Sequence, residues 1–565
     1  MTAMRQPHPI DSGTSAFGPL EAALENVFQQ LERSLFVDAL WARRLDVWSA
    51  DASVQQRIAD RLGWLDAPDS VSSHTARLQA FSTSVRDDNF SDIVLLGMGG
   101  SSLAPEVLRA VIGAAPGFPR FQVLDSVDPE SVNAAMARAA TSIFVLASKS
   151  GSTIEPNALA AEAERRLRAA GVAEPGSRFV AITDEGTALH HRALDQRFRE
   201  VFINPSDIGG RYSALSLFGM VPAALMGIDI HKVLASARAM ADACRAADPR
   251  RNPGLVLGAI IAAATRSGRD KLTLVLPPHL EPFGLWVEQL VAESTGKQGT
   301  GVVPVFGEAA DVQLGDDRFV VQLSLGDEAP ATAIKKRGSA QHTPSLAIHI
   351  PDLTTLGAEF FRWELATAAT GWLLGVNPFD EPNVQQAKDA TRVLLDRYSA
   401  DGQLPVREPD AVIEGARLTL SDAARRITDP LAFLQLLQPS DYFGLLVYLP
   451  PEAGAWTETL QELRDAIATR TGVATTLGYG PRYLHSTGQL HKGGANTGVF
   501  MLVTADVTVD LPLPGASYSF GVLEIAQATG DFESLNHSGR RALHVHLPKR
   551  APDLLRRIAR EILAR

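Results

Sequence analysis

Hydrophobic residues are spaced in two different ways along the chain. From residue 18 to residue 85 they recur at helical spacing, as in LEAALENVFQQLERSLFVDALW, with charged residues between them. From residue 92 onward, short apolar runs such as DIVLLGMGG and SIFVLAS alternate with helical stretches such as EPNALAAEAERRLRAAG. Such alternation is typical of a parallel sheet with helices on both faces. We therefore expect a helical N-terminal region over residues 1–85, followed by α/β structure.

The alternating pattern runs through three successive regions. It predicts two doubly wound parallel-sheet domains, over residues 86–245 and 246–398. The segment SADGQLPVREPDA, residues 399–411, is polar and contains two prolines and a glycine, which indicates a linker. Beyond it, runs such as DYFGLLVYLP and GVFMLVTAD predict an additional C-terminal α/β domain over residues 412–565.

Composition excludes several classes of function. The chain has 565 residues and a net charge of −11, from 53 basic and 64 acidic residues, without a basic patch, so nucleic acid is not an expected partner. The only cysteine, Cys244, excludes an intrachain disulfide framework and favours a reducing compartment. The N-terminus MTAMRQPHPIDSG lacks a signal pattern, and no stretch approaches the roughly 18 apolar residues of a membrane span. These features predict a cytoplasmic protein that is not bound to a membrane.

A cluster of hydroxyl groups follows one of the predicted strands. In SKSGST, residues 148–153, the hydroxyls of Ser148, Ser150, Ser152 and Thr153 surround Lys149 just before a helix. Backbone N–H groups at a helix N-terminus and hydroxyl donors together suit a phosphate, and lysine adds charge. A polar turn that only caps the helix would need one or two of these hydroxyls. The pattern favours a phosphate-binding loop over such a turn.

An earlier loop has a related composition. GMGGSS, residues 97–102, has glycines that allow close approach of the backbone to a ligand, and Ser101 and Ser102 can donate hydrogen bonds. The loop has neither the GxGxxG of a dinucleotide site nor the GxxxxGK[ST] of a triphosphate loop. A single phosphate on a small organic molecule fits both loops better.

Two further segments place charged residues next to apolar ones. Arg211 in DIGGRYSALS follows two glycines and precedes a helix, where it could clamp a phosphate, stabilise an oxyanion or cap a helix at the surface. Glu288 and Glu293 lie on an apolar helix, and Glu293 is near its end. A carboxylate in such surroundings can have a raised pKa and act as a general base, although most such glutamates are solvated.

Taken together, these motifs resemble those of the phosphoglucose isomerase family, which is built from two phosphosugar-binding (SIS-type) domains. The resemblance rests on five segments that occur in one order: GMGGSSLAP (97–105), ASKSGSTIEP (147–156), DIGGRYSALS (207–216), VAESTGKQG (291–299) and NPFDEPNVQQAK (377–388).

The resemblance implies a role for each matching residue. The sugar phosphate would be held by Ser101, Ser148, Lys149, Ser150 and Thr153, with Ser102 and Ser152 as further candidates. Glu293 would move the proton between C1 and C2, Arg211 would stabilise the cis-enediolate, and Lys388 would assist ring opening. No metal or cofactor is expected, since proton transfer through an enediol needs only a base, an acid and electrostatic stabilisation.

The chain departs from the family in two places. Glu381 stands where the family usually has glutamine, which places a further carboxylate near the site and leaves the details of recognition open. The family's ring-opening histidine normally follows the catalytic glutamate by some thirty residues, whereas here a related motif, GPRYLHSTGQLHKGG, lies at 480–494. Its histidines His485 and His491 are rivals for the role, and either could instead be structural.

The displaced motif resembles the isomerase portion of bifunctional transaldolase/phosphoglucose isomerases. The chain would then be a fragment of such a fusion or a freestanding descendant, with the transaldolase elsewhere. Because the family often takes the histidine from a neighbouring subunit, a homodimer is a further expectation.

The expected function is an aldose–ketose isomerase that interconverts glucose 6-phosphate and fructose 6-phosphate without a metal, in glycolysis and gluconeogenesis. The alternatives are another phosphosugar isomerase and a non-catalytic phosphosugar-sensing protein. A sensor would usually carry a DNA-binding module and would not need Glu293, Arg211 and Lys388 together.

Overall fold

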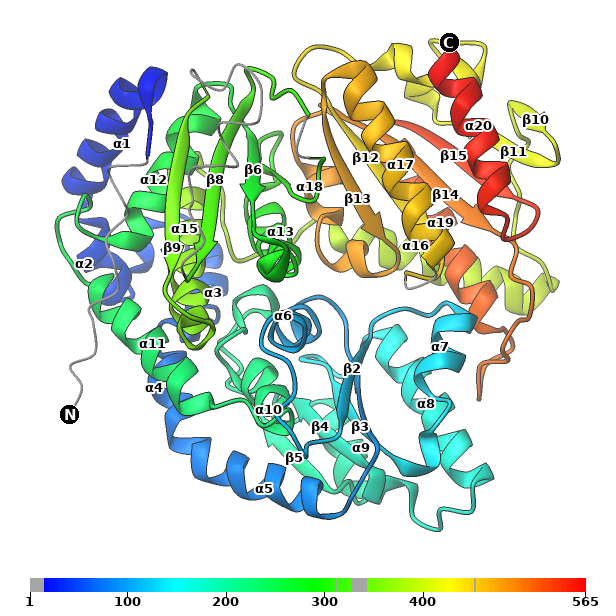
Figure 1. The fold of residues 1–565 in the computed structure, drawn as a ribbon, viewed down its shortest axis with the longest axis horizontal. Coiled ribbons are helices and arrows are strands. Elements are labelled where there is room, and N and C mark those ends of the chain that lie inside the picture. Colours follow the sequence, from blue (N-terminus) through cyan, green and yellow to red (C-terminus); the bar gives the residue numbers. More distant parts are fainter. Residues whose placement is uncertain (1–14, 310–311, 327–342, 452–453) are drawn as a thin grey trace.

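The computed structural model describes residues 15–309, 312–326, 343–451 and 454–565. The segment MTAMRQPHPIDSG, in which we expected no signal sequence, lies outside these ranges. In the described residues, the strands form three sheets, each flanked by helices (Figure 1). Across the same ranges, no helix combines the length and the apolar character that crossing a membrane requires.

The helical N-terminal region is confirmed for the described residues. Its helices are α1 (Glu21–Arg33), α2 (Phe36–Trp41), α3 (Ala52–Ala59), α4 (Ala67–Ser70) and α5 (Thr75–Asp87). In α1, Leu24, Val27, Phe28 and Leu31 form one buried face at helical spacing. These helices pack along the outside of the first two sheets, with α1 on α12 (Pro253–Arg266) and α5 on α10 (Leu217–Leu225).

The first sheet is parallel and has the strand order β2-β1-β3-β4-β5. Its strands are β1 (Asp92–Leu96), β2 (Arg120–Leu124), β3 (Ser142–Ala147), β4 (Phe179–Thr183) and β5 (Glu200–Ile203). Its other helices are α6 (Leu103–Val111), α7 (Pro129–Ala135), α8 (Ile154–Ala169), α9 (Ala188–Asp195) and α11 (Ile230–Ala243). Strand β5 was not anticipated, because its short run EVFI follows a strongly polar stretch.

Helices cover both faces of this sheet, as the continuous apolar runs predicted. In β1, Ile93 and Leu95 belong to one hydrophobic core, whereas Val94 and Leu96 belong to another on the opposite face. The carboxyl edge of the sheet is thereby left as the place where loops can build a polar site.

The second sheet is also parallel, with the order β7-β6-β8-β9. Its strands are β6 (Lys271–Val275), β7 (Val303–Val305), β8 (Arg318–Leu325) and β9 (Ser345–Ile350). Helix α15 (Leu356–Leu374) is buried along nearly its whole length between α11, α12 and α13 (Phe283–Thr295). It thus joins the first two sheets through one shared core.

The third sheet has the order β10-β11-β15-β14-β12-β13. The strands β12 (Tyr442–Tyr448), β13 (Ala474–Tyr479), β14 (Gly498–Ala505) and β15 (Arg541–Leu547) are parallel, and β10 (Ala411–Ile413) and β11 (Ala416–Leu420) add an antiparallel edge. Its helices are α17 (Gly454–Thr471), α18 (Gly488–Gly493), α19 (Phe520–His537) and α20 (Pro552–Ala564). The expected C-terminal α/β structure is therefore present.

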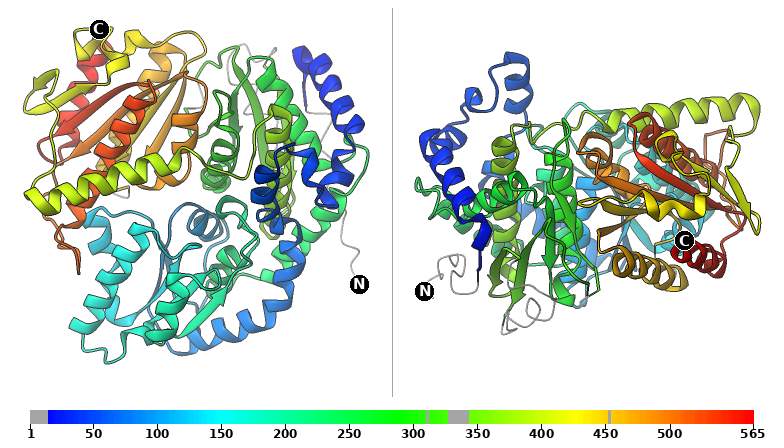
Figure 2. Two further views of the ribbon diagram at one scale, coloured as in Figure 1. Left: turned by 180° about the vertical axis from the view of Figure 1, so that it is seen from behind. Right: turned by 90° about the horizontal axis from the view of Figure 1, so that it is seen from above.

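The third sheet packs against the first sheet's helices through two long helices. Helix α16 (Val384–Asp401) lies along α19, between the third sheet and the first (Figure 2). Leu395 of α16 and Phe520 and Leu523 of α19 share a core with Leu159 of α8. The domain boundary expected at residue 398 falls inside α16, and the division into domains remains our proposal.

Candidate active site

The SKSGST loop leaves the carboxyl end of β3 and ends where α8 begins. Ser148 Oγ lies 3.2 Å from Thr153 Oγ1 and accepts a hydrogen bond of 3.1 Å from the N–H of Gly151. Ser150 Oγ lies 2.9 Å from Ser152 Oγ. These contacts hold the hydroxyls together at the N-terminus of a long helix, as a site for an anion requires.

Lys149 points away from the hydroxyls of its own loop. Its Nζ donates to Asp184 Oδ2 at 2.5 Å and to the carbonyl of Ser206 at 2.7 Å. It also lines a small hollow of about 60 Å³ together with Arg211 and Glu381. The charge of Lys149 therefore lies between the SKSGST loop and the Arg211 segment.

The GMGGSS loop packs tightly against two other segments of the site. A Cβ on Gly99, whose φ is +53°, would lie 2.7 Å from the carbonyl oxygen of His485. A Cβ on Gly100 would lie 2.0 Å from the carbonyl oxygen of Gly210, just before Arg211. The glycines are needed because the backbones approach more closely than a side chain allows. Ser102 is buried and donates to Asp125, while the more exposed Ser101 precedes it.

Glu293 and Arg211 form a buried ion pair. Arg211 Nη1 lies 3.2 Å from Glu293 Oε1, and Arg211 Nε donates to Ser294 Oγ at 2.9 Å. The other Nη group of Arg211 donates to the carbonyls of Pro378 and Asp380, so the guanidinium is fixed from several sides. Burial raises the pKa of Glu293, Arg211 opposes this, and the nearby carboxylate of Glu381 raises it further.

Gln289 connects Glu293 to the histidine motif. Its Nε2 donates to Glu293 Oε2 at 3.2 Å and to the carbonyl of His485 at 2.8 Å. Gln289 lies four residues before Glu293 on α13, so both side chains share one helix face. We did not predict this residue, although its spacing from Glu293 was available in the sequence.

His485 and Glu155 form a second pair, next to the SKSGST loop. His485 Nε2 lies 3.0 Å from Glu155 Oε1. This oxygen also accepts a hydrogen bond of 2.7 Å from Gln527 Nε2. Burial alone would raise the pKa of Glu155, but His485 and its hydrogen bond hold that pKa below the ordinary value. Glu155 was missed because an acidic residue in the first turn of a helix is unremarkable.

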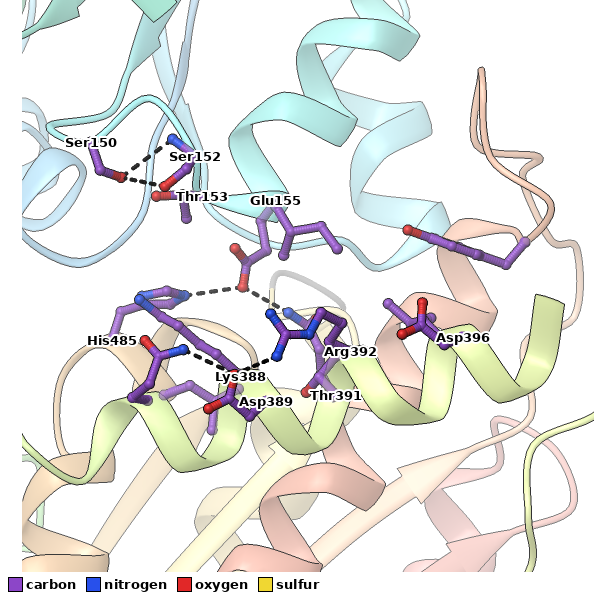
Figure 3. A pocket seen from close by; sticks show the side chains of 16 residues that line it. Ser150, Ser152, Thr153, Glu155, Lys388, Asp389, Thr391, Arg392, Asp396 and His485 are labelled. Carbon is purple, nitrogen blue, oxygen red and sulfur yellow. Dashed lines mark hydrogen bonds and ion pairs between the residues drawn. The ribbon is translucent and has the colours of Figure 1, made fainter. Parts of the chain in front are cut away.

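A cavity of about 430 Å³ lies beside the pair of His485 and Glu155, and neither Glu293 nor Arg211 is among the residues that line it. Its wall includes Ser150, Ser152, Thr153, Glu155, Lys388 and His485 (Figure 3). Lys388 extends from α16 toward His485, on the side of the cavity opposite the phosphate loop. The structure thus brings together residues from three distant parts of the chain, all within one copy of it.

Comparisons with known proteins point to the same family as the sequence motifs. The family model described as phosphoglucose isomerase matches residues 67–315. A glucose-6-phosphate isomerase of Parasynechococcus marenigrum (strain WH8102) is 31% identical over 387 residues, which cover 60% of this chain and 68% of that protein. The chain belongs to the phosphoglucose isomerase family. A glucose-6-phosphate isomerase of Geobacter sp. (strain M21) is 27% identical over 421 residues, which cover 63% of this chain and 79% of that protein.

Solved structures share the fold of the phosphoglucose isomerase family with this chain. A hypothetical protein from Thermus thermophilus superposes with a TM-score of 0.55 at 23% identity, covering 67% of this chain and 98% of that one. A glucose-6-phosphate isomerase from Chlamydia trachomatis gives 0.53 at 19% identity, covering 67% and 86%.

The match to the phosphoglucose isomerase model includes the phosphate loops, Arg211 and Glu293, but it ends before Lys388 and His485. The structure nevertheless places His485 at the cavity, next to residues inside the matched segment. His491 lies elsewhere, buried among aromatic rings, with its ring centroid 4.8 Å from that of Phe500. Burial holds the pKa of His491 well below its ordinary value.

Glu381, the residue that departs from the family pattern, contacts the catalytic candidate Arg211 directly. Its Oε2 accepts 3.0 Å from Arg211 Nη1, the same atom that pairs with Glu293. Lys297 lies close by, and burial together with Arg211 lowers its pKa to about 8. Among the side chains that the structure describes, no group of three or more His, Cys, Asp or Glu is arranged as a metal ion would need.

Proposed function

We propose that the chain is an aldose–ketose isomerase that interconverts glucose 6-phosphate and fructose 6-phosphate through a cis-enediolate, without a metal. The observation that carries the proposal is the buried ion pair of Glu293 and Arg211. Gln289, on the same helix as Glu293, links Glu293 to the His485 segment at the cavity. Membership of the phosphoglucose isomerase family supports the choice of substrate.

Binding relies on the two loops at the carboxyl edge of the first sheet. The hydroxyls of Ser101, Ser148, Ser150 and Thr153 and the α8 N-terminus hold the phosphate, and Lys149 contributes positive charge nearby. Ser102 supports the first loop from beneath through Asp125. The phosphate thereby anchors the sugar and leaves C1 and C2 to the other side chains.

Ring opening requires a proton at the ring oxygen and loss of one from the anomeric hydroxyl. His485 lies at the cavity with Glu155 fixing its ring, and Lys388 faces it from α16. In our proposal His485 delivers a proton to the ring oxygen as the bond between C1 and that oxygen breaks, the anomeric hydroxyl loses its proton to water, and Lys388 assists at the ring oxygen.

Isomerisation then moves one proton between the carbons and one between the oxygens. Glu293 removes the C2 proton of the aldose, the electron pair of the broken C–H bond forms the enediolate, and Glu293 returns the proton to C1 while the hydroxyl proton moves from O2 to O1. Negative charge develops on the oxygen during this step, and Arg211 is held rigidly enough to stabilise it there. The raised pKa of Glu293 suits a group that must both accept and return a proton near neutral pH.

The proposal extends to the wider setting of the protein. We place it in the cytoplasm and divide it into a helical N-terminal region, two phosphosugar-binding domains and a C-terminal α/β domain. A homodimer and a separate transaldolase are compatible with this proposal, but the site as described needs neither.

The test is a coupled assay of glucose 6-phosphate formation from fructose 6-phosphate, with and without a chelator. We expect chelator-insensitive turnover that falls roughly 100- to 10,000-fold in Glu293→Gln, with sugar phosphate binding nearly unchanged. Glu288→Gln is the matched control: it is buried on the same helix, and burial raises its pKa to about 8, so the amide replaces a carboxyl that is mostly neutral at pH 7. Binding without turnover by the unsubstituted protein would favour a phosphosugar sensor instead.

A further inference from the structure

The His485 segment is anchored to the first sheet's loops by a side chain outside the cavity. Arg482 begins the short 3-10 helix Arg482–His485 that leaves β13. Its Nε and Nη2 donate to the two oxygens of Asp125, each at 2.7 Å, in a bidentate arrangement. Asp125 lies just after β2, 357 positions away in the sequence.

Asp125 also supports the GMGGSS loop. Its Oδ2 accepts a hydrogen bond of 3.2 Å from Ser102 Oγ, and Ser102 directly follows Ser101. Both residues are buried: the side chain of Asp125 is 4% exposed, and Ser102 is 0% exposed. One buried carboxylate therefore fixes both the loop that is proposed to bind phosphate and the segment that carries the histidine.

The 3-10 helix Arg482–His485 is also held within the third-sheet region, where the Tyr483 hydroxyl donates to Asp531 of α19 at 2.7 Å. The side chain of His485 contacts Glu155 of the first sheet's α8, and its carbonyl accepts from Gln289 of α13.

Arg482 is not among the residues that line the cavity, and its guanidinium donates both hydrogen bonds to Asp125. We infer that the Arg482–Asp125 pair is a positioning device that sets His485 at the sugar ring relative to the bound phosphate. This inference rests on the proposed isomerase function.

The inference separates ring opening from proton transfer. Arg211, which pairs with Glu293, is held by Ser294 and residues 378–381, and none of these contacts involves Arg482 or His485. Gln289 contacts both Glu293 and the carbonyl of His485, so displacing His485 should impair the reaction of a closed sugar ring strongly and that of an open sugar only slightly.

The experiment compares glucose 6-phosphate with 5-deoxyfructose 6-phosphate, which lacks the hydroxyl needed to close a ring. In Arg482→Gln we expect kcat on glucose 6-phosphate to fall about 10- to 100-fold, because small misplacements of a catalytic group have effects of this size. The open-chain substrate should lose no more than about 3-fold. Arg482→Lys, which keeps the charge without the bidentate geometry, should lie between Arg482→Gln and the unsubstituted protein.

Two further variants make the result decisive. Asp125→Asn combined with Arg482→Gln should be little worse than Asp125→Asn alone, since both changes break the same ion pair and Asp125→Asn also alters the contact with Ser102. Arg557→Gln, which breaks an exposed arginine–carboxylate pair with Glu414 in the same domain, should leave both rates unchanged. Equal losses on the two substrates, or no loss on either, would overturn the inference alone. Failure of the unsubstituted protein to isomerise glucose 6-phosphate would overturn the proposed function and this inference with it.

Discussion

Arg211 shares one nitrogen between two carboxylates. Its Nη1 lies 3.2 Å from Glu293 and 3.0 Å from Glu381, the residue that replaces the family's glutamine. A second negative charge beside a base disfavours the ionised form of that base. The proton affinity of Glu293 is therefore set partly by a residue that does not itself move the proton.

Replacing Glu381 by Gln should lower the pKa of Glu293, because it removes the nearby charge and leaves Arg211 free to pair with Glu293 alone. In the proposed mechanism Glu293 acts as a base only when deprotonated, so the acid limb of the kcat/KM profile should move to lower pH. The profile of Glu408→Gln, which removes an exposed carboxylate from the linker, controls for net charge. An unmoved limb, or one displaced to higher pH, would contradict this assignment.

The two histidines of the C-terminal motif should respond differently to alanine. His485→Ala should lower turnover of glucose 6-phosphate by about 100-fold or more while leaving the melting temperature nearly unchanged. His491→Ala empties a space among aromatic rings and should destabilise the fold by about 2 kcal/mol or more, with activity retained in the folded fraction. Thermal unfolding and kinetics on the same samples separate the two effects, and the reverse pattern would restore His491 as the ring opener.

At the scale of elements, the site depends on loops whose backbones touch. The GMGGSS loop rests on the Gly209–Tyr212 segment at Gly100 and on the His485 segment at Gly99. An added Cβ is not accommodated at either contact, so close approach of the backbones helps to set the spacing between the GMGGSS loop, the Arg211 guanidinium and His485. Strain introduced there should therefore alter catalysis before it alters the cores of the sheets.

Gly100→Ala places a methyl group 2.0 Å from the carbonyl oxygen of Gly210, and the loops must separate to admit it. We expect a cost of roughly 1–3 kcal/mol in stability and a fall of about 10- to 100-fold in kcat/KM. Gly210→Ala is the matched control from the opposite side of the same contact, since its added Cβ would meet no atom within 4 Å. If the two variants behave alike, close packing of these loops is not what positions the site.

At the scale of the whole molecule, one chain supplies every side chain of the candidate site. The first sheet provides the phosphate loops, α13 provides Glu293, α16 provides Lys388, and the third sheet's connection provides His485. His485 reaches the site within its own chain, where its Nε2 lies 3.0 Å from Glu155 Oε1.

Mixing two inactive variants tests this arrangement. If Glu293 and His485 of one chain act together, combining Glu293→Gln with His485→Ala under conditions that allow subunit exchange should restore no activity. Specific activity of the unsubstituted protein should also stay constant on dilution. An equimolar mixture that recovers about a quarter of the normal activity per site would instead mean that the histidine acts between chains, because half of the dimers would be hybrids with one intact site of two.

Much of the architecture could be predicted from local patterns. The alternation of apolar runs and helices gave the parallel sheets, and the clustered hydroxyls of SKSGST marked the carboxyl edge of β3. The choice between His485 and His491 could not be made locally, because both lie in one short motif and only their surroundings differ.

The contact partners of the site residues could not be predicted from the sequence, for a different reason. Glu155 meets His485 across 330 positions and Gln527 across 372, and Arg482 meets Asp125 across 357. No periodicity connects such positions, since the contact arises only when the third sheet docks on the first. Gln289 is the exception, because its position one helical turn before Glu293 already placed it beside the base.

Helix α19 is buried on two opposite sides. Phe520, Leu523 and Ala526 pack with the first sheet's helices, whereas Phe532 and Leu535 pack with the third sheet. Detaching the third sheet would expose apolar surface on both partners at once, so the two regions should melt as one cooperative unit. Heat would then not release the histidine from a phosphate site that is still folded, and the enzyme would lose ring opening and substrate binding at the same temperature.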